Sequence, residues 1–146
     1  MEDDIQIYIT RIDVPQGDSC EDIKKRKQII KDFYALWNAA HPDKKVWNKS
    51  LQDYINVKYL SINETMGHAS ISYDSTMAVI RLTEILEMAV VVKKGPAKSN
   101  DKNQRPFDQM IVMMHQGIRL LVGHQKVTGE YVQYCITKKA SLGRWL

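Results

Sequence analysis

His68, Arg119 and Thr137 are the residues of this chain whose types and places best suit acid–base chemistry. His68 comes just before a predicted helix, and the other two fall on predicted strands. Acid–base cleavage of RNA requires a base near the 2′-hydroxyl, an acid at the leaving oxygen and a cation on the phosphate. These three side chains can supply such groups if the fold brings them together. We therefore take them as the candidate catalytic residues.

The spacing of the histidines and cysteines predicts no metal site. The four histidines, His41, His68, His115 and His124, follow neither an H-x-x-x-H nor an H-E-x-x-H pattern. The two cysteines belong to no C-x-x-C motif, so we expect Cys20 and Cys135 to be reduced thiols, the second half-buried on a strand. We predict neither a metal nor another cofactor.

Basic residues gather at two places in the sequence. The first group is Lys24, Lys25, Arg26 and Lys27, and the second is Lys138, Lys139 and Arg144. The first group stands near the start of a predicted helix, where positive charge opposes the helix dipole, and this favours a role in binding anions. The formal net charge of +4 also favours acidic partners. We predict that these residues contact RNA or DNA; the alternative is that they form solvated faces.

Hydrophobic spacing predicts the secondary structure of most of the chain. Residues 5–9 alternate between apolar and polar side chains, which is typical of a strand. A helix follows, capped by Asp18 or Ser19 and ended at His41, because the residue before a proline resists the helical conformation. The segment 42–56 mixes both periods and has no clear assignment.

The second half of the chain alternates helical and strand-like segments. Residues 57–62 predict a short strand, Asn63 predicts the cap of a brief helical turn that Gly67 interrupts, and residues 75–92 predict a long central helix. A polar loop is expected at 93–106. Three final strands are predicted at 109–114, 118–123 and 131–137, the last two forming a hairpin with a turn at Thr128-Gly129.

These elements predict an α+β fold. We expect two principal helices packed on a mostly antiparallel sheet of about four to five strands. The length of 146 residues suits a single globular domain, residues 1–146, with a flexible loop at about 93–106. The acidic start and the lack of a long apolar run predict no signal peptide, no contact with a membrane and a cytoplasmic location.

The order of the elements resembles that of a group of small domains. It is carried by the segments "YINVKYLSI", "GHAS", "STMAVIRLTEILEMA", "IRLLVGHQ" and "YVQYCITK", and it covers roughly residues 5 to 138. The chain is similar in this order to small domains associated with large polyvalent proteins of phages and mobile elements. Some of those domains are linked to the barnase, EndoU, colicin-nuclease and RelE superfamily, which packs helices against an antiparallel sheet.

The resemblance implies nucleic-acid binding or RNA cleavage by a domain of a bacterial mobile element or phage. Only His68, as a histidine at the entry to a helix, and Arg119 or Thr137, as sheet residues, can be carried over from that superfamily. A clear pair of glutamate and histidine is not evident in the sequence. The alternative is therefore a non-catalytic protein-interaction module that shares the fold, with Trp145 and Leu146 available for contact.

Overall fold

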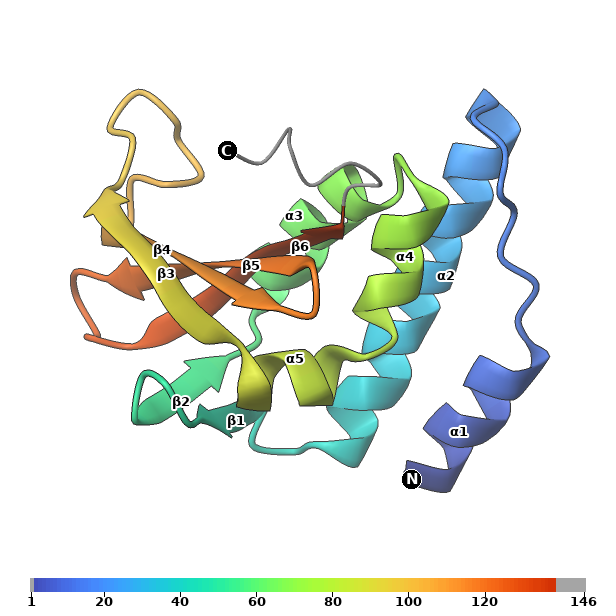
Figure 1. The fold of residues 1–146 in the computed structure, drawn as a ribbon, viewed down its shortest axis with the longest axis horizontal. Coiled ribbons are helices and arrows are strands. Elements are labelled where there is room, and N and C mark those ends of the chain that lie inside the picture. Colours follow the sequence, from blue (N-terminus) through green and yellow to red (C-terminus); the bar gives the residue numbers. More distant parts are fainter. Residues whose placement is uncertain (1, 139–146) are drawn as a thin grey trace.

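The computed structural model describes residues 2–138, which form five helices and six strands (Figure 1). The helices are α1 (Glu2–Arg11), α2 (Cys20–Ala40), α3 (Tyr59–Ala69), α4 (Tyr73–Val79) and α5 (Leu82–Met88). The strands are β1 (Lys45–Asn48), β2 (Asp53–Asn56), β3 (Val90–Pro96), β4 (Phe107–His115), β5 (Ile118–Gln125) and β6 (Tyr131–Lys138). The predicted α+β class is confirmed, whereas the predicted number of helices is too small.

The six strands form one mixed sheet in the order β1-β2-β6-β5-β4-β3. Strands β3, β4, β5 and β6 form one antiparallel unit, in which each strand pairs with the next along the chain, and β1 and β2 form a second antiparallel unit. The two units join where β2 pairs in parallel with β6. The prediction of four to five mostly antiparallel strands was therefore wrong in number and did not include the parallel pair.

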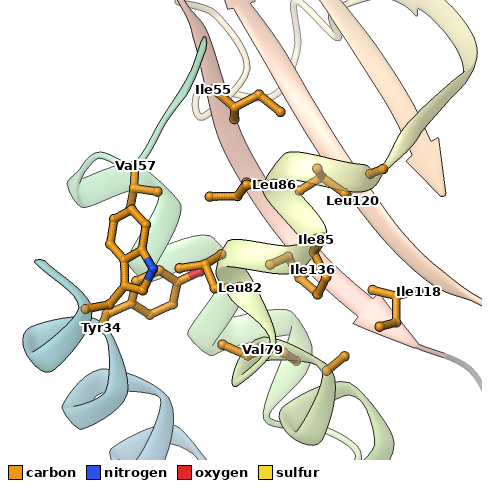
Figure 2. Close-up of a cluster of buried hydrophobic side chains, with 14 of the residues drawn as sticks. Tyr34, Ile55, Val57, Val79, Leu82, Ile85, Leu86, Ile118, Leu120 and Ile136 are labelled. Carbon is orange, nitrogen blue, oxygen red and sulfur yellow. The ribbon is translucent and has the colours of Figure 1, made fainter. Parts of the chain in front are cut away.

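One face of the sheet is covered by α2, α4 and α5, and α1 lies on the outer side of α2 (Figure 1). The main core fills the space between these helices and the sheet. Figure 2 shows part of it, where Leu82, Ile85 and Leu86 of α5 lie near Leu120 and Ile136 of the sheet. The buried side chains of α2 are at Arg26, Ile30, Phe33, Tyr34 and Trp37. Helical spacing predicts one apolar side made of Ile23 and the four apolar members of that set, and of these five only Ile23 is not fully buried.

Residues 5–9 form part of α1, so the predicted N-terminal strand is wrong. Ile5 is buried, and Tyr8 and Ile9 pack against the core, whereas Ile7 is 49% exposed. The covered positions are thus three and four residues apart, as on one side of a helix. Positions 5 and 9 fit the period of a strand as well as that of a helix. The exposed Ile7 between them made the segment resemble the alternation of a strand.

The predicted central helix at 75–92 is also wrong, since this segment forms most of α4, all of α5 and the start of β3. The side chain of Asn48 is buried at the end of α5. Its Nδ2 donates hydrogen bonds to the carbonyl oxygens of Leu86 and Ala89, at 2.8 and 3.0 Å. These are carbonyl groups that a longer helix would pair internally. The β-branched run that follows pairs with β4 instead.

The predicted strand at 57–62 is largely helical, because α3 begins at Tyr59. The Oγ atom of Ser61 accepts a hydrogen bond from the backbone N–H of Lys58 and so stabilises the first turn. Neither predicted signal in α3 acts as expected, since Asn63 does not cap a helix and Gly67 lies inside one. The unassigned segment 42–56 contains β1 and β2.

The predictions of the long N-terminal helix and of the last three strands are confirmed. Helix α2 follows Ser19, whose Oγ accepts a hydrogen bond from the backbone N–H of Asp22 at 3.1 Å, and it ends before His41. Strands β4, β5 and β6 lie where they were predicted, and β5 and β6 form the expected antiparallel pair. Strand β3 extends to Pro96, so the polar loop is shorter than expected and covers residues 97–106.

Candidate functional site

The outer face of the sheet, opposite the main core, carries two of the predicted catalytic residues. Arg119 on β5 lies directly across from Thr137 on β6. Leu121 and Cys135, two residues along each strand, form the next cross-strand pair on the same face. The side chains between them, such as Leu120 and Ile136, belong to the main core on the other face. Arg119 and Thr137, two candidate residues on neighbouring strands, therefore lie side by side on one surface of the sheet.

Helix α3 lies beside β6 and forms one side of this surface (Figure 1). Strand β2 pairs with β6 only at Tyr131 and Val132, so α3 can pack along the rest of β6. A buried hydrogen-bond network fixes it there. Gln133 donates from Nε2 to Oγ1 of Thr65 at 2.6 Å and accepts from the Tyr34 hydroxyl at 2.8 Å. Burial raises the pKa of Tyr34, and the network holds α3 in a defined register on β6.

Glu64 and His68 form a pair on α3 beside this network, since Glu64 is next to Thr65 in the helix. They are four residues apart, so both lie on one side of the helix. The Nε2 atom of His68 is 3.3 Å from Oε2 of Glu64. The glutamate side chain is only 11% exposed, whereas the histidine side chain is 54% exposed. The structure thus supplies the glutamate–histidine pair that was not evident in the sequence.

The buried thiol of Cys135 is influenced by the charges of both Glu64 and Arg119. Burial raises its pKa to about 12, the nearby Arg119 guanidinium acts to lower it, and the Glu64 carboxylate acts to raise it. Both charged groups therefore act electrostatically on this one sulfur atom. We call the set Glu64, His68, Arg119, Cys135 and Thr137 the α3–sheet site. Among the residues that the structure describes, no hydrogen bond joins His68 directly to Arg119 or Thr137.

The loop at 97–106 contacts the same site. Asn103 donates a hydrogen bond from Nδ2 to Oε1 of Glu64 at 2.6 Å. Gln104 is 8% exposed and hydrogen-bonds with Tyr134, whose pKa is raised by burial and then by the charges of Glu64 and Asp101. No pattern in the sequence predicts that this polar loop lies against α3. Its position leaves the Glu64 carboxylate held from two directions, by Asn103 and by His68.

The predicted basic residues are divided by the structure. Lys24, Lys25 and Lys27 are exposed on α2. Arg26 is fully buried, so its predicted contact with a nucleic acid is wrong. Its guanidinium donates hydrogen bonds to four backbone carbonyl oxygens, those of Pro15, Gly17, Ser70 and Ile71, at 2.7 to 3.2 Å. It joins the segment before α2 to the turn between α3 and α4.

The second basic group lies mostly outside the described residues. Lys138 ends β6, and its backbone N–H and carbonyl are both hydrogen-bonded to the Ser75 hydroxyl of α4. Its side chain is partly exposed. The predicted nucleic-acid contacts of Lys139 and Arg144 stay predictions, because both residues lie outside the described range. The same holds for the predicted protein contact of Trp145 and Leu146.

Two other histidines pair with carboxylates away from the α3–sheet site. His115 lies 2.6 Å from Glu84, which also pairs with Arg81, and these hydrogen bonds lower the pKa of Glu84. His124 lies 2.8 Å from Asp108. The described part of the chain holds no group of three or more histidine, cysteine or acidic side chains that could bind a metal.

The environment of Cys135 leads to a prediction about its reactivity. A thiol reacts as the thiolate, so a pKa of about 12 should leave Cys135 inert at about pH 8. Cys20 is exposed. We expect iodoacetamide to modify one thiol per native chain and both thiols in urea, as counted by intact-mass spectrometry. The Cys20→Ser variant should show no modification in the native state, and rapid labelling of that variant would contradict the described burial.

No family model, no curated protein and no solved structure matches this chain. In residues 2–138 no helix has the length and apolar character needed to cross a membrane. The α3–sheet site must therefore be interpreted from its own chemistry.

Proposed function

We propose that this protein binds nucleic acid and cleaves RNA at the α3–sheet site, as a domain of a phage or bacterial mobile element. The observation that supports this most is the position of the Glu64–His68 pair beside a sheet face that carries Arg119. A carboxylate–imidazole pair with a nearby guanidinium matches the groups needed for acid–base cleavage of a phosphodiester. The resemblance of the sequence to such domains is the reason for proposing this biological setting.

In the proposed reaction, His68 is the base. Glu64 accepts a hydrogen bond from Nε2–H of the imidazole, which leaves Nδ1 able to take a proton. The 2′-hydroxyl of the substrate gives its proton to Nδ1, and the 2′-oxygen attacks the phosphorus. The bond from phosphorus to the 5′-oxygen breaks, and this oxygen takes a proton from water. The products are a 2′,3′-cyclic phosphate and a 5′-hydroxyl end.

The two sheet residues act on the phosphate in this proposal. The Arg119 guanidinium stabilises the negative charge that develops on the phosphate oxygens. Thr137, directly across from it, can donate its hydroxyl to the same group. Asn103 keeps the Glu64 carboxylate in place by donating to the oxygen that does not face His68. The DNA backbone lacks the 2′-hydroxyl, so the same site should bind DNA without cutting it.

The proposal predicts binding that depends strongly on salt. Phosphate contacts release counterions, so affinity for single-stranded RNA should fall by at least about tenfold between roughly 50 and 200 mM salt. Fluorescence anisotropy with labelled RNA and DNA measures this, and gel analysis measures cleavage. We expect both to bind and only RNA to be cut. A protein that binds neither at the lowest salt would refute the proposed function, and cleavage of DNA would refute the 2′-hydroxyl mechanism.

The alternative function is a non-catalytic protein-interaction module. One observation favours it: Val90 and Val92 are 56% and 63% exposed on β3, an edge strand paired only with β4. An unpaired strand edge with exposed apolar side chains can pair with a strand of a partner protein. The exposed Lys93 and Lys94 on the same strand oppose such pairing. We therefore keep nucleic-acid binding as the main proposal.

A further inference from the structure

A groove of about 380 Å³ lies between α2 and α3, away from the α3–sheet site. It is lined by Lys31, Ala35, Asn38, Tyr59, Ile62, Asn63 and Met66. The ring of Tyr59 at its edge is unusually open, since the residue is 78% exposed. The volume is within the range of sites that hold a small ligand or one group of a larger one.

Asn38 has an unused hydrogen-bonding group in this groove. Its side-chain oxygen is buried and has no hydrogen-bond partner among the described residues. Buried polar atoms nearly always have a partner, because an unsatisfied one costs about 1–3 kcal/mol. Asn38 therefore has an acceptor without a partner on a residue that lines the groove.

A row of positive charge leads along α2 into the groove. Lys24, Lys27 and Lys31 are three and four residues apart, so they lie on one side of the helix. Ala35 and Asn38 continue the same side to the groove floor. The helix rises about 1.5 Å per residue, so the lysines follow one another at about 4.5 and 6 Å. None of the three makes an ion pair with another residue in the described range.

Glu21 lies beside the start of this row, three residues before Lys24, whereas the acidic residue nearest the groove end is turned away from it. Asp32 lies about 100° further round the helix from Lys31 and accepts a hydrogen bond from Gln28 at 2.8 Å. Lys25 lies off the row by a similar angle, and Arg26 is buried. Of the basic residues predicted near the helix start, only Lys24 and Lys27 therefore belong to the row.

We propose that this groove binds one base of a single-stranded nucleic acid, and this inference rests on the proposed function. Tyr59 stacks on the base, Asn38 hydrogen-bonds to its edge, and the lysine row holds the phosphates that follow. Single strands are recognised in this way by a basic track combined with an exposed aromatic ring. The groove contacts only the base and the lysine row contacts only the phosphates. Because RNA and DNA share these groups, we expect single strands of both to bind equally well.

The groove and the α3–sheet site are on two sides of the same helix. Tyr59, Asn63 and Met66 share the groove side of α3, whereas Glu64 and His68 share the other exposed side. A helix with its side chains is about 10–12 Å wide, so a strand a few nucleotides long can reach both. The groove would then bind the nucleotides next to the one that is cut.

The test is binding of short labelled strands that cannot be cleaved. DNA and 2′-O-methyl RNA of about twelve nucleotides both lack the reactive hydroxyl, so binding is measured independently of catalysis. The variants are Tyr59→Ala and Lys31→Ala. The matched controls are Tyr54→Ala and Lys94→Ala. The first removes an exposed tyrosine of β2 and the second an exposed lysine of β3, both outside the groove.

We expect Tyr59→Ala to weaken binding of both strands by about 5- to 100-fold, which is the usual effect of removing one stacking contact. Lys31→Ala should weaken it and lower the slope of log affinity against log salt by about 0.7. If wild type binds but Tyr59→Ala and Lys31→Ala bind as the controls do, the groove is not the subsite, although the proposed function still holds. Binding of a duplex as tightly as a single strand would also contradict the proposed groove, since a paired base cannot enter it. If wild type binds no strand at all, both proposals fail.

Discussion

Replacing His68 with glutamine is expected to lower RNA cleavage by about 10²- to 10⁴-fold, the usual effect of removing a general acid or base. Glutamine keeps the size and polarity of the side chain but cannot take a proton at neutral pH. The His68 side chain is 54% exposed, so the melting temperature should hardly change. Single-turnover cleavage and thermal unfolding measure the two effects.

Two further variants separate the base from its neighbours. Glu64→Gln should lower cleavage less than His68→Gln and shift the pH profile of cleavage, because the carboxylate acts through the imidazole rather than on the substrate. His124→Gln removes a histidine that also pairs with a carboxylate but lies away from the site, so it should leave cleavage unchanged. Full activity in His68→Gln would show that His68 is not the base.

Replacing Arg26 with alanine is expected to lower the free energy of unfolding by roughly 3–5 kcal/mol. The change removes the donor to four backbone carbonyls, the best buried of which, that of Ser70, would be left without this partner. Lysine should recover only part of the loss, because one ammonium group cannot reproduce the planar fork of a guanidinium. The midpoint of urea unfolding gives the change directly.

The neighbours of Arg26 on α2 provide a matched control. Lys25→Ala and Lys27→Ala remove a similar side chain from exposed positions, so each should change the free energy of unfolding by no more than about 0.5 kcal/mol. A loss of less than about 1 kcal/mol in Arg26→Ala would mean that the four hydrogen bonds contribute little to stability.

The fold could be predicted where one period dominated a long segment. Helix α2 was predicted because its apolar residues follow one spacing and Ser19 marks its start. Strand β4 was predicted because its segment is apolar on both faces, and β5 and β6 because they flank the Thr128-Gly129 turn. The segment at 75–92 could not be predicted, because its ending depends on hydrogen bonds from Asn48, about forty residues earlier in the chain. Long-range contacts of this kind leave no local pattern.

The candidate site shows the same limit. His68, Arg119 and Thr137 could be chosen by type and by their places on predicted elements. Glu64 was missed, although it stands four residues before His68, because the segment was assigned to a strand and a brief turn rather than to one helix. Arg26 was placed among the exposed lysines for a similar reason, since charge runs are usually solvated and only the fold shows which member is buried.

The position of β6 in the middle of the sheet determines when the sheet can be completed during synthesis. Within residues 2–138, the β1–β2 unit and the β3–β5 unit are joined into one sheet through β6. A nascent chain that has emerged only to residue 130 therefore holds two separate half-sheets, each with an unprotected edge. Such edges favour aggregation until the missing strand arrives. The ribosome must release residues 131–138 before the α3–sheet site can form, because Cys135 and Thr137 lie on β6.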